Sequence, residues 1–211
     1  VLRAATPQAR IAMVLATGTW CAYNDWGGSN HYQGLTGPEG KLFAPNVSVL
    51  RPWAKGFVQW PADAPRIPHA TPPNRPPAYP HMDYARANGI SKKYASSGWA
   101  AFERPFALWC EHQGIALDYL TQHDLHRAPS CLNAYPRALI VGHDEYWTWE
   151  MRDALDRAVR TRDDYRVLPV LLPGADEGSV SRFLARRVWV DFRGGPDDDA
   201  ALQRGVDGLA V

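Results

Sequence analysis

The residues best equipped for chemistry stand together in the middle of the 211-residue sequence. His143, Asp144 and Glu145 follow four apolar residues and Gly142. An imidazole and two carboxylates in one turn are costly unless a positive group holds them, and a metal ion is the simplest candidate. We predict His143 as an acid–base or orienting catalytic group, the alternative being a histidine bonded to backbone in the turn. Asp144 is a second catalytic candidate, although an aspartate in this position more often caps a turn.

Two further segments carry polar side chains suited to a site. Residues 17–32 are dense in aromatic and polar groups, and two glycines there allow backbone to approach a ligand. Within this segment Asn24 and Asp25 are predicted to orient substrate or fix the loop, and Trp26 to form a pocket wall. His123 and His126 are predicted to line the same ligand-binding crevice as His143 and the residues of this segment. A His-x-x-His pair can bind zinc, but alone it is a weak signal, and structural hydrogen bonding is the favoured interpretation.

The elements that must position these groups are strands and helices in alternation. Apolar runs predict strands at 11–16, 115–120 and 138–141, and helical spacing predicts helices over 100–113 and 150–159. This order predicts an α/β fold with a doubly wound, mostly parallel sheet, flavodoxin-like, the three-layer sandwich of class I glutamine-amidotransferase-like domains. Each polar segment then follows the carboxyl end of a strand, where open α/β sheets bind ligands.

The stretch from about residue 44 to residue 98 is rich in proline and glycine, with Pro-Pro-Asn-Arg-Pro-Pro at 72–77. No periodicity survives there, so we expect a long Pro-rich loop or lid over the site.

Composition excludes several classes of function. A formal charge of +1 and scattered basic residues give no case for a nucleic-acid or membrane-surface partner. Three dispersed cysteines suggest neither a disulfide framework nor a zinc knuckle, and a cytoplasmic location is expected. The apolar run at 11–16 is too short for a signal sequence or a membrane span. The turn after residue 141 offers no Cys or Ser nucleophile, which argues against covalent hydrolase chemistry.

Several motifs in order resemble the large (beta) subunit of N,N-dimethylformamidase and its relatives, over about residues 1–160. They are Thr-Trp-Cys-Ala-Tyr-Asn-Asp-Trp-Gly-Gly at 19–28, Val-Ser-Val-Leu-Arg-Pro at 47–52, Ser-Lys-Lys-Tyr-Ala-Ser at 91–96, Gln-His-Asp-Leu-His at 122–126 and Gly-His-Asp-Glu-Tyr-Trp at 142–147.

The resemblance implies a mononuclear Fe(III) held by two tyrosines and a glutamate. It also implies that the protein uses this metal to hydrolyse a small amide. Carried over by motif, Glu145 is the carboxylate ligand and Tyr23 the first phenolate. The family's Arg-Pro-Tyr is Arg-Pro-Trp here, with Trp53 in the tyrosine's place, and indole has no acceptor to replace phenolate. Tyr32, Tyr84 and Tyr94 are possible substitutes, and Tyr32 is the favoured second ligand because it follows the Gly-Gly turn near Tyr23. The family also implies a small subunit or a homo-oligomer as partner.

After residue 160 the sequence no longer resembles the dimethylformamidase family. Strands are predicted within 165–174 and 187–192, with helices at 179–186 and 200–209. The phrases Arg-Val-Leu-Pro-Val-Leu-Leu-Pro-Gly-Ala at 166–175 and Val-Trp-Val-Asp-Phe-Arg at 188–193 resemble the carboxy-terminal half of bacterial TIR domains. We divide the chain into a dimethylformamidase-like domain, 1–160, and a TIR-like segment, 161–211, that completes the same sheet. Two alternatives stay open at this point: a non-catalytic truncated or fused scaffold, and, less favoured, a TIR enzyme that cleaves NAD.

Overall fold

The computed structural model describes residues 6–32, 46–65 and 79–161, together with 170–171, 190–191 and residue 200. The chain divides into two compact units, residues 1–155 and 156–211. All of the predicted site residues belong to the first unit.

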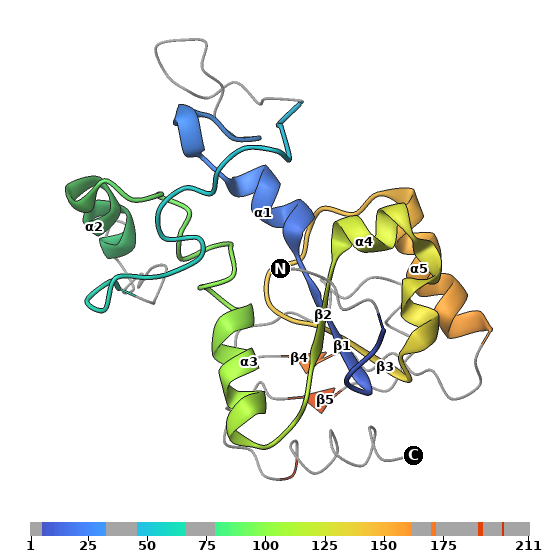
Figure 1. Ribbon diagram of the computed structural model, residues 1–211. Coiled ribbons are helices and arrows are strands. Elements are labelled where there is room, and N and C mark those ends of the chain that lie inside the picture. Colours follow the sequence, from blue (N-terminus) through green and yellow to red (C-terminus); the bar gives the residue numbers. More distant parts are fainter. Residues whose placement is uncertain are drawn as a thin grey trace. The chain divides into compact units, whose positions relative to one another are not determined.

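A parallel sheet organises the first unit (Figure 1). Its central strand β1 (Ile11–Leu15) lies between β2 (Asp118–Thr121) and β3 (Arg137–Ile140), in the order β2-β1-β3, and both pairings are parallel. Successive residues of β1 point to opposite faces, and Ala12 to Leu15 are all at most 1% exposed. A strand buried on both faces is typical of a parallel sheet covered by helices, so the predicted α/β class is confirmed.

A helix follows each of the three strands. In chain order the helices are α1 (Thr17–Tyr23), α2 (Pro80–Asn88), α3 (Glu103–His112), α4 (Gln122–Arg127) and α5 (Trp149–Arg160), with short 3₁₀ turns η1 (Trp26–Gly28) and η2 (Pro129–Ala134). Helix α1 follows β1, α4 follows β2 and α5 follows β3. Ala107 of α3 packs with Met13 and Leu15 on one face of β1. The helices predicted over 100–113 and 150–159 correspond to α3 and α5, so both predictions are confirmed.

Two sequence expectations need correction. The sequence predicts no helix directly after β1, but Thr17–Tyr23 form the helix α1. The stretch 44–98 was expected to lack regular structure, yet it contains α2, which begins at a proline and ends at Gly89 in the left-handed conformation. Only His81 and Ala85 of α2 are buried, so the helical pattern in its sequence is short and weak.

Little of the second unit is described. Two-residue strands β4 (Val170–Leu171) and β5 (Val190–Asp191) pair in parallel, within the predicted strands. The predicted helix at 179–186, the helix at 200–209 after its first residue, and most of the TIR-like phrases lie outside the described residues.

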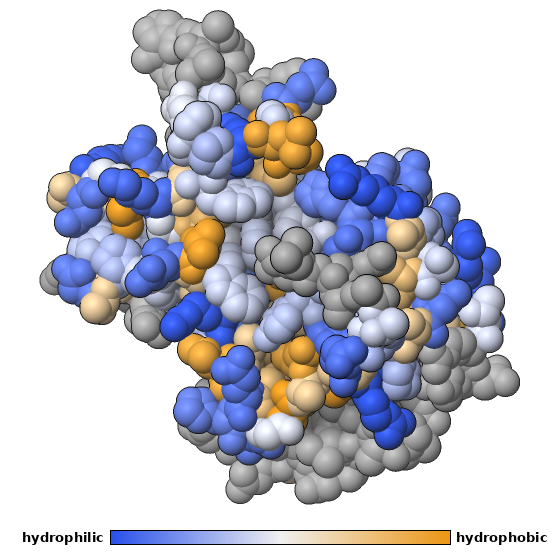
Figure 2. Space-filling view, in the orientation of Figure 1, coloured by the Kyte–Doolittle hydropathy of each residue, from blue (hydrophilic) through white to orange (hydrophobic). Residues whose placement is uncertain are grey.

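On the face drawn in Figure 2, hydrophilic residues predominate over the described part of the chain and hydrophobic residues stand in small separate groups. None of the helices in that part of the chain combines the length and the apolar composition needed to cross a bilayer.

Candidate functional site

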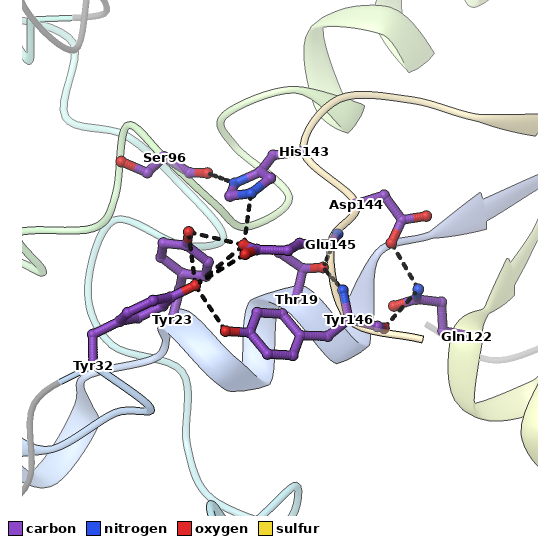
Figure 3. Close-up of polar contacts among 9 residues, drawn as sticks. All are labelled: Thr19, Tyr23, Tyr32, Ser96, Gln122, His143, Asp144, Glu145 and Tyr146. Atoms are coloured by element: carbon purple, nitrogen blue, oxygen red, sulfur yellow. Dashed lines mark hydrogen bonds and ion pairs between the residues drawn. The ribbon is translucent and has the colours of Figure 1, made fainter. Parts of the chain in front are cut away.

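Because the strands are parallel, their carboxyl ends share one edge of the sheet. At this edge α1 follows β1, α4 follows β2, and residues 141–148, which we call the elbow, follow β3. In Figure 3, side chains of α1 and of the elbow, far apart in sequence, meet together with Tyr32, Ser96 and Gln122.

Three oxygen-bearing side chains converge at the centre of Figure 3. The Tyr23 hydroxyl lies 3.0 Å from Glu145 Oε2. The Tyr32 hydroxyl lies 3.3 Å from Glu145 Oε1, 3.2 Å from Oε2 and 3.1 Å from the Tyr23 hydroxyl. We call Tyr23, Tyr32 and Glu145 the oxygen cluster. Its carboxylate side chain is 46% exposed, so small molecules can reach it.

His143 touches the oxygen cluster from the elbow. Its Nε2 is 3.1 Å from Glu145 Oε2, and its Nδ1 is 2.8 Å from the carbonyl oxygen of Ser96. A carbonyl only accepts, so Nδ1 carries a proton and Nε2 is the nitrogen that faces the cluster. The imidazole also lies edge-on to the Tyr23 ring at 5.0 Å.

The elbow conformation depends on a glycine and a threonine. Gly142 has φ 82°, and a Cβ there would collide with the Phe102 side chain, so only glycine fits. Thr19 Oγ accepts the backbone N–H groups of Glu145 (2.8 Å) and Tyr146 (3.1 Å). One fully buried hydroxyl on α1 therefore sets the position of the elbow.

Asp144 lies apart from the oxygen cluster and is directed toward α4 (Figure 3). Its carboxylate accepts from Gln122 Nε2 at 2.7 Å and also takes side-chain hydrogen bonds from Trp147 and Thr19. Burial raises the pKa of Asp144 to about 7. These contacts are those of a residue that shapes the turn, and its predicted catalytic role stays a prediction.

The second polar segment is held by Asn24 and Arg51. The fully buried Asn24 side chain donates to the Pro52 carbonyl (2.9 Å) and accepts from the backbone N–H of Trp26 and Ala54. The Arg51 guanidinium donates to backbone carbonyls between residues 21 and 29. Of the two roles predicted for Asn24, the structure shows the loop-fixing one.

Asp25 and Trp26 make few contacts with the site. Asp25 accepts the backbone N–H of Lys92 at 3.3 Å, which ties the segment after α1 to residues 91–96. Trp26 is 48% exposed.

His123 and His126 stand on α4, at the same edge of the sheet. His123 Nδ1 is 2.8 Å from Thr17 Oγ, and burial lowers the pKa of this imidazole. His126 Nδ1 is 3.0 Å from Thr148 Oγ. The two imidazoles thus bond to different threonines, in keeping with the favoured interpretation of structural hydrogen bonding.

The structure discriminates among the possible second tyrosines. Tyr84 donates to Asp63 (2.7 Å), and the buried Tyr94 donates to the Pro65 carbonyl (2.7 Å), so neither hydroxyl bonds to the oxygen cluster. Trp53 packs in the hydrophobic core against Trp20, at 5.8 Å and edge-on. Tyr32 is the tyrosine that the structure brings to Tyr23 and Glu145.

Two residues of the site were missed from sequence. The Tyr146 hydroxyl donates to the Tyr32 hydroxyl at 2.7 Å, and the Lys93 ammonium lies 5.6 Å and 5.4 Å from the ring centroids of Tyr23 and Tyr32. Tyr146 lies in the family motif at 142–147 and Lys93 in the family motif at 91–96. Their membership of these motifs is the sequence feature that could have pointed to them.

Comparison with known proteins agrees with the sequence motifs. Residues 1–161 match the family described as N,N-dimethylformamidase beta subunit-like, C-terminal. No curated protein gives a significant match to the chain. The oxygen cluster lies wholly within the matched residues.

Proposed function

The chain belongs to the N,N-dimethylformamidase beta subunit-like family over residues 1–161, and from this membership together with the oxygen cluster we propose that it is a metal-dependent amide hydrolase domain. Ferric iron is held by Tyr23, Tyr32 and Glu145, and the substrate is a small N-substituted amide. The single observation that carries the proposal is the approach of both phenol oxygens to one carboxylate at 3.0–3.3 Å.

The donor atoms suit Fe(III). Ferric iron is a hard cation that prefers anionic oxygen ligands, which two phenolates and a carboxylate supply. In the described residues no three His, Cys, Asp or Glu side chains gather as a metal site, so a metal here depends on the tyrosines. Burial, reinforced by the neighbouring carboxylate, raises the pKa of both Tyr23 and Tyr32. Their ionisation near neutral pH therefore requires a nearby cation.

A ferric ion at the cluster supplies Lewis acidity toward an amide carbonyl and toward water. His143 holds or moves the proton. Because its Nδ1–H is committed to the Ser96 carbonyl, Nε2, which faces Glu145 Oε2 at 3.1 Å, is the nitrogen that would accept a proton from attacking water and return it to the leaving amine. The Lys93 ammonium adds positive charge over the rings of Tyr23 and Tyr32, which favours their ionised forms.

The sheet supports the finer fold proposal. The order β2-β1-β3 with parallel pairing is the order in which a flavodoxin-like sheet begins. We therefore retain the doubly wound, glutamine-amidotransferase-like sandwich as the proposed architecture.

Visible absorption tests the proposed metal site. The protein loaded with ferric iron is expected to show a phenolate-to-iron charge-transfer band, and Tyr23→Phe and Tyr32→Phe are each expected to weaken and shift it. Tyr84→Phe is the matched control, because that hydroxyl bonds to Asp63 outside the cluster, and its band should match that of the wild type. Iron-supplemented wild-type protein that stays colourless would refute the site.

Amide hydrolysis by the iron-loaded protein tests the proton role. Removing a general acid–base group costs about 10²-fold or more in rate. His143→Gln should therefore lower hydrolysis by about that factor while the charge-transfer band persists. Equal hydrolysis by His143→Gln and wild type would exclude the role.

A further inference from the structure

The shortest contact among the tyrosines of the site joins Tyr146 to Tyr32 of the oxygen cluster. Tyr146 donates its hydroxyl proton to the Tyr32 oxygen at 2.7 Å. The contacts that Tyr23, Tyr32 and Glu145 make with one another are longer, at 3.0–3.3 Å. Figure 3 shows the three phenols arranged so that Tyr146 reaches the cluster through Tyr32.

Tyr146 is held in place from several directions. Its backbone N–H donates to Thr19 Oγ at 3.1 Å, and its carbonyl oxygen accepts from Gln122 Nε2 at 3.2 Å. Its ring stacks on the His31 imidazole, with the centroids 5.4 Å apart and the planes 14° from parallel. The hydroxyl is thus presented to Tyr32 by a side chain with little freedom to turn away.

The direction of the hydrogen bond decides which role Tyr146 can take. Each phenol has one proton to donate. Tyr146 gives its proton to the Tyr32 oxygen, and Tyr32 directs its own toward Glu145 or Tyr23. When Tyr32 gives up that proton to become a ligand, its oxygen still has a lone pair for Tyr146. A charge-assisted hydrogen bond of this kind is shorter and stronger than one between neutral groups.

We propose that Tyr146 is a positioning residue: by donating a hydrogen bond to Tyr32, it fixes Tyr32 as the second phenolate ligand. Tyr32 takes this role because Trp53 occupies the position at which the family's Arg-Pro-Tyr motif has its tyrosine. This inference rests on the proposed iron site. Tyr146 itself is not a ligand, and it acts only through the Tyr32 oxygen.

The test compares iron-loaded wild type with Tyr146→Phe, which keeps the ring that stacks on His31 and loses only the hydroxyl. A donated hydrogen bond stabilises the phenolate lone pairs, so its loss should move the charge-transfer band to longer wavelength. Hydrogen bonds to charged groups correspond to roughly tenfold or more in an equilibrium constant. Retention of iron against a chelator should therefore weaken by about that factor in Tyr146→Phe. Circular dichroism is the check that the variant still folds.

The double variant Tyr32→Phe/Tyr146→Phe separates action through Tyr32 from a general structural effect. If Tyr146 acts through Tyr32, adding Tyr146→Phe to Tyr32→Phe should leave the remaining band and the iron retention unchanged. A second shift of similar size would overturn the inference, as would a wild-type band that Tyr146→Phe does not move. A colourless wild type would instead refute the iron site, and the inference with it.

Discussion

Glu103 offers a stability prediction whose size follows from the structure. Its side chain is 1% exposed. Glu103 Oε1 accepts from Trp20 Nε1 (2.9 Å) and from the backbone N–H of Ala16 (3.3 Å), and in the described part of the chain Oε2 has no hydrogen-bond partner. Burial raises the pKa of this carboxyl from 4.5 to about 7. The contact with Trp20 links α3 to α1, the helix that carries Tyr23.

The sign of the pH dependence follows from that shift. A raised pKa means that the folded protein binds the proton more tightly than the unfolded chain. Stability contributed by the protonated carboxyl is therefore complete below about pH 4.5 and is lost as pH rises through 7. One pKa unit corresponds to about 1.4 kcal/mol, so the loss between pH 5 and pH 8 is about 2 kcal/mol.

Chemical denaturation of wild type and Glu103→Gln at pH 5, 6, 7 and 8 measures this effect. The free energy of unfolding of wild type should fall relative to that of Glu103→Gln by about 2 kcal/mol over this range. Glu111→Gln, at an exposed position on α3, controls for the loss of a carboxylate and should run parallel to wild type. Parallel curves for wild type and Glu103→Gln would show that Glu103 is already ionised at pH 5, and the argument from burial would fail.

Two substitutions test how the elbow is held. Gly142→Ala should lower the free energy of unfolding by about 2 kcal/mol or more, because of the positive φ and the collision with Phe102. The control Gly114→Ala, also at positive φ but with open space around its Cβ, should lower it by only about 1 kcal/mol. Thermal unfolding measures both, and equal losses would contradict the collision. Thr19→Val leaves two backbone N–H groups of the elbow without an acceptor and should lower the free energy of unfolding by about 2–4 kcal/mol. Thr19→Ser keeps the hydroxyl and should be about as stable as wild type. A valine variant as stable as the serine variant would show that the hydroxyl does not hold the elbow.

The sequence anticipates the centre of the site because the physics there is simple. A continuous apolar run predicts β1, and parallel strands place their carboxyl ends at one edge. Those two facts bring the segments of Tyr23 and Glu145, 122 residues apart, to one edge, and the resemblance to the dimethylformamidase family implied these two side chains.

What the sequence does not anticipate depends on contacts distant along the chain. The helix α1 has only seven residues, and the carbonyls of Cys21 within it and of Asn24 at its C-cap accept from the distant Arg51, so no local signal predicts it. Tyr32 was favoured from the sequence, but the acceptors that hold the Tyr84 and Tyr94 hydroxyls, at residues 63 and 65, are contacts that no local pattern shows. Tyr146 was overlooked because a tyrosine beside a tryptophan resembles ordinary core packing.

Elemental analysis of the purified, iron-supplemented chain tests the central claim most directly. The iron site predicts close to one iron per chain in wild type, and loss of that iron in a Tyr23→Phe/Glu145→Gln variant that still folds. Iron that is absent from folded wild type, or retained equally by the double variant, would contradict a metal centre built from these oxygens.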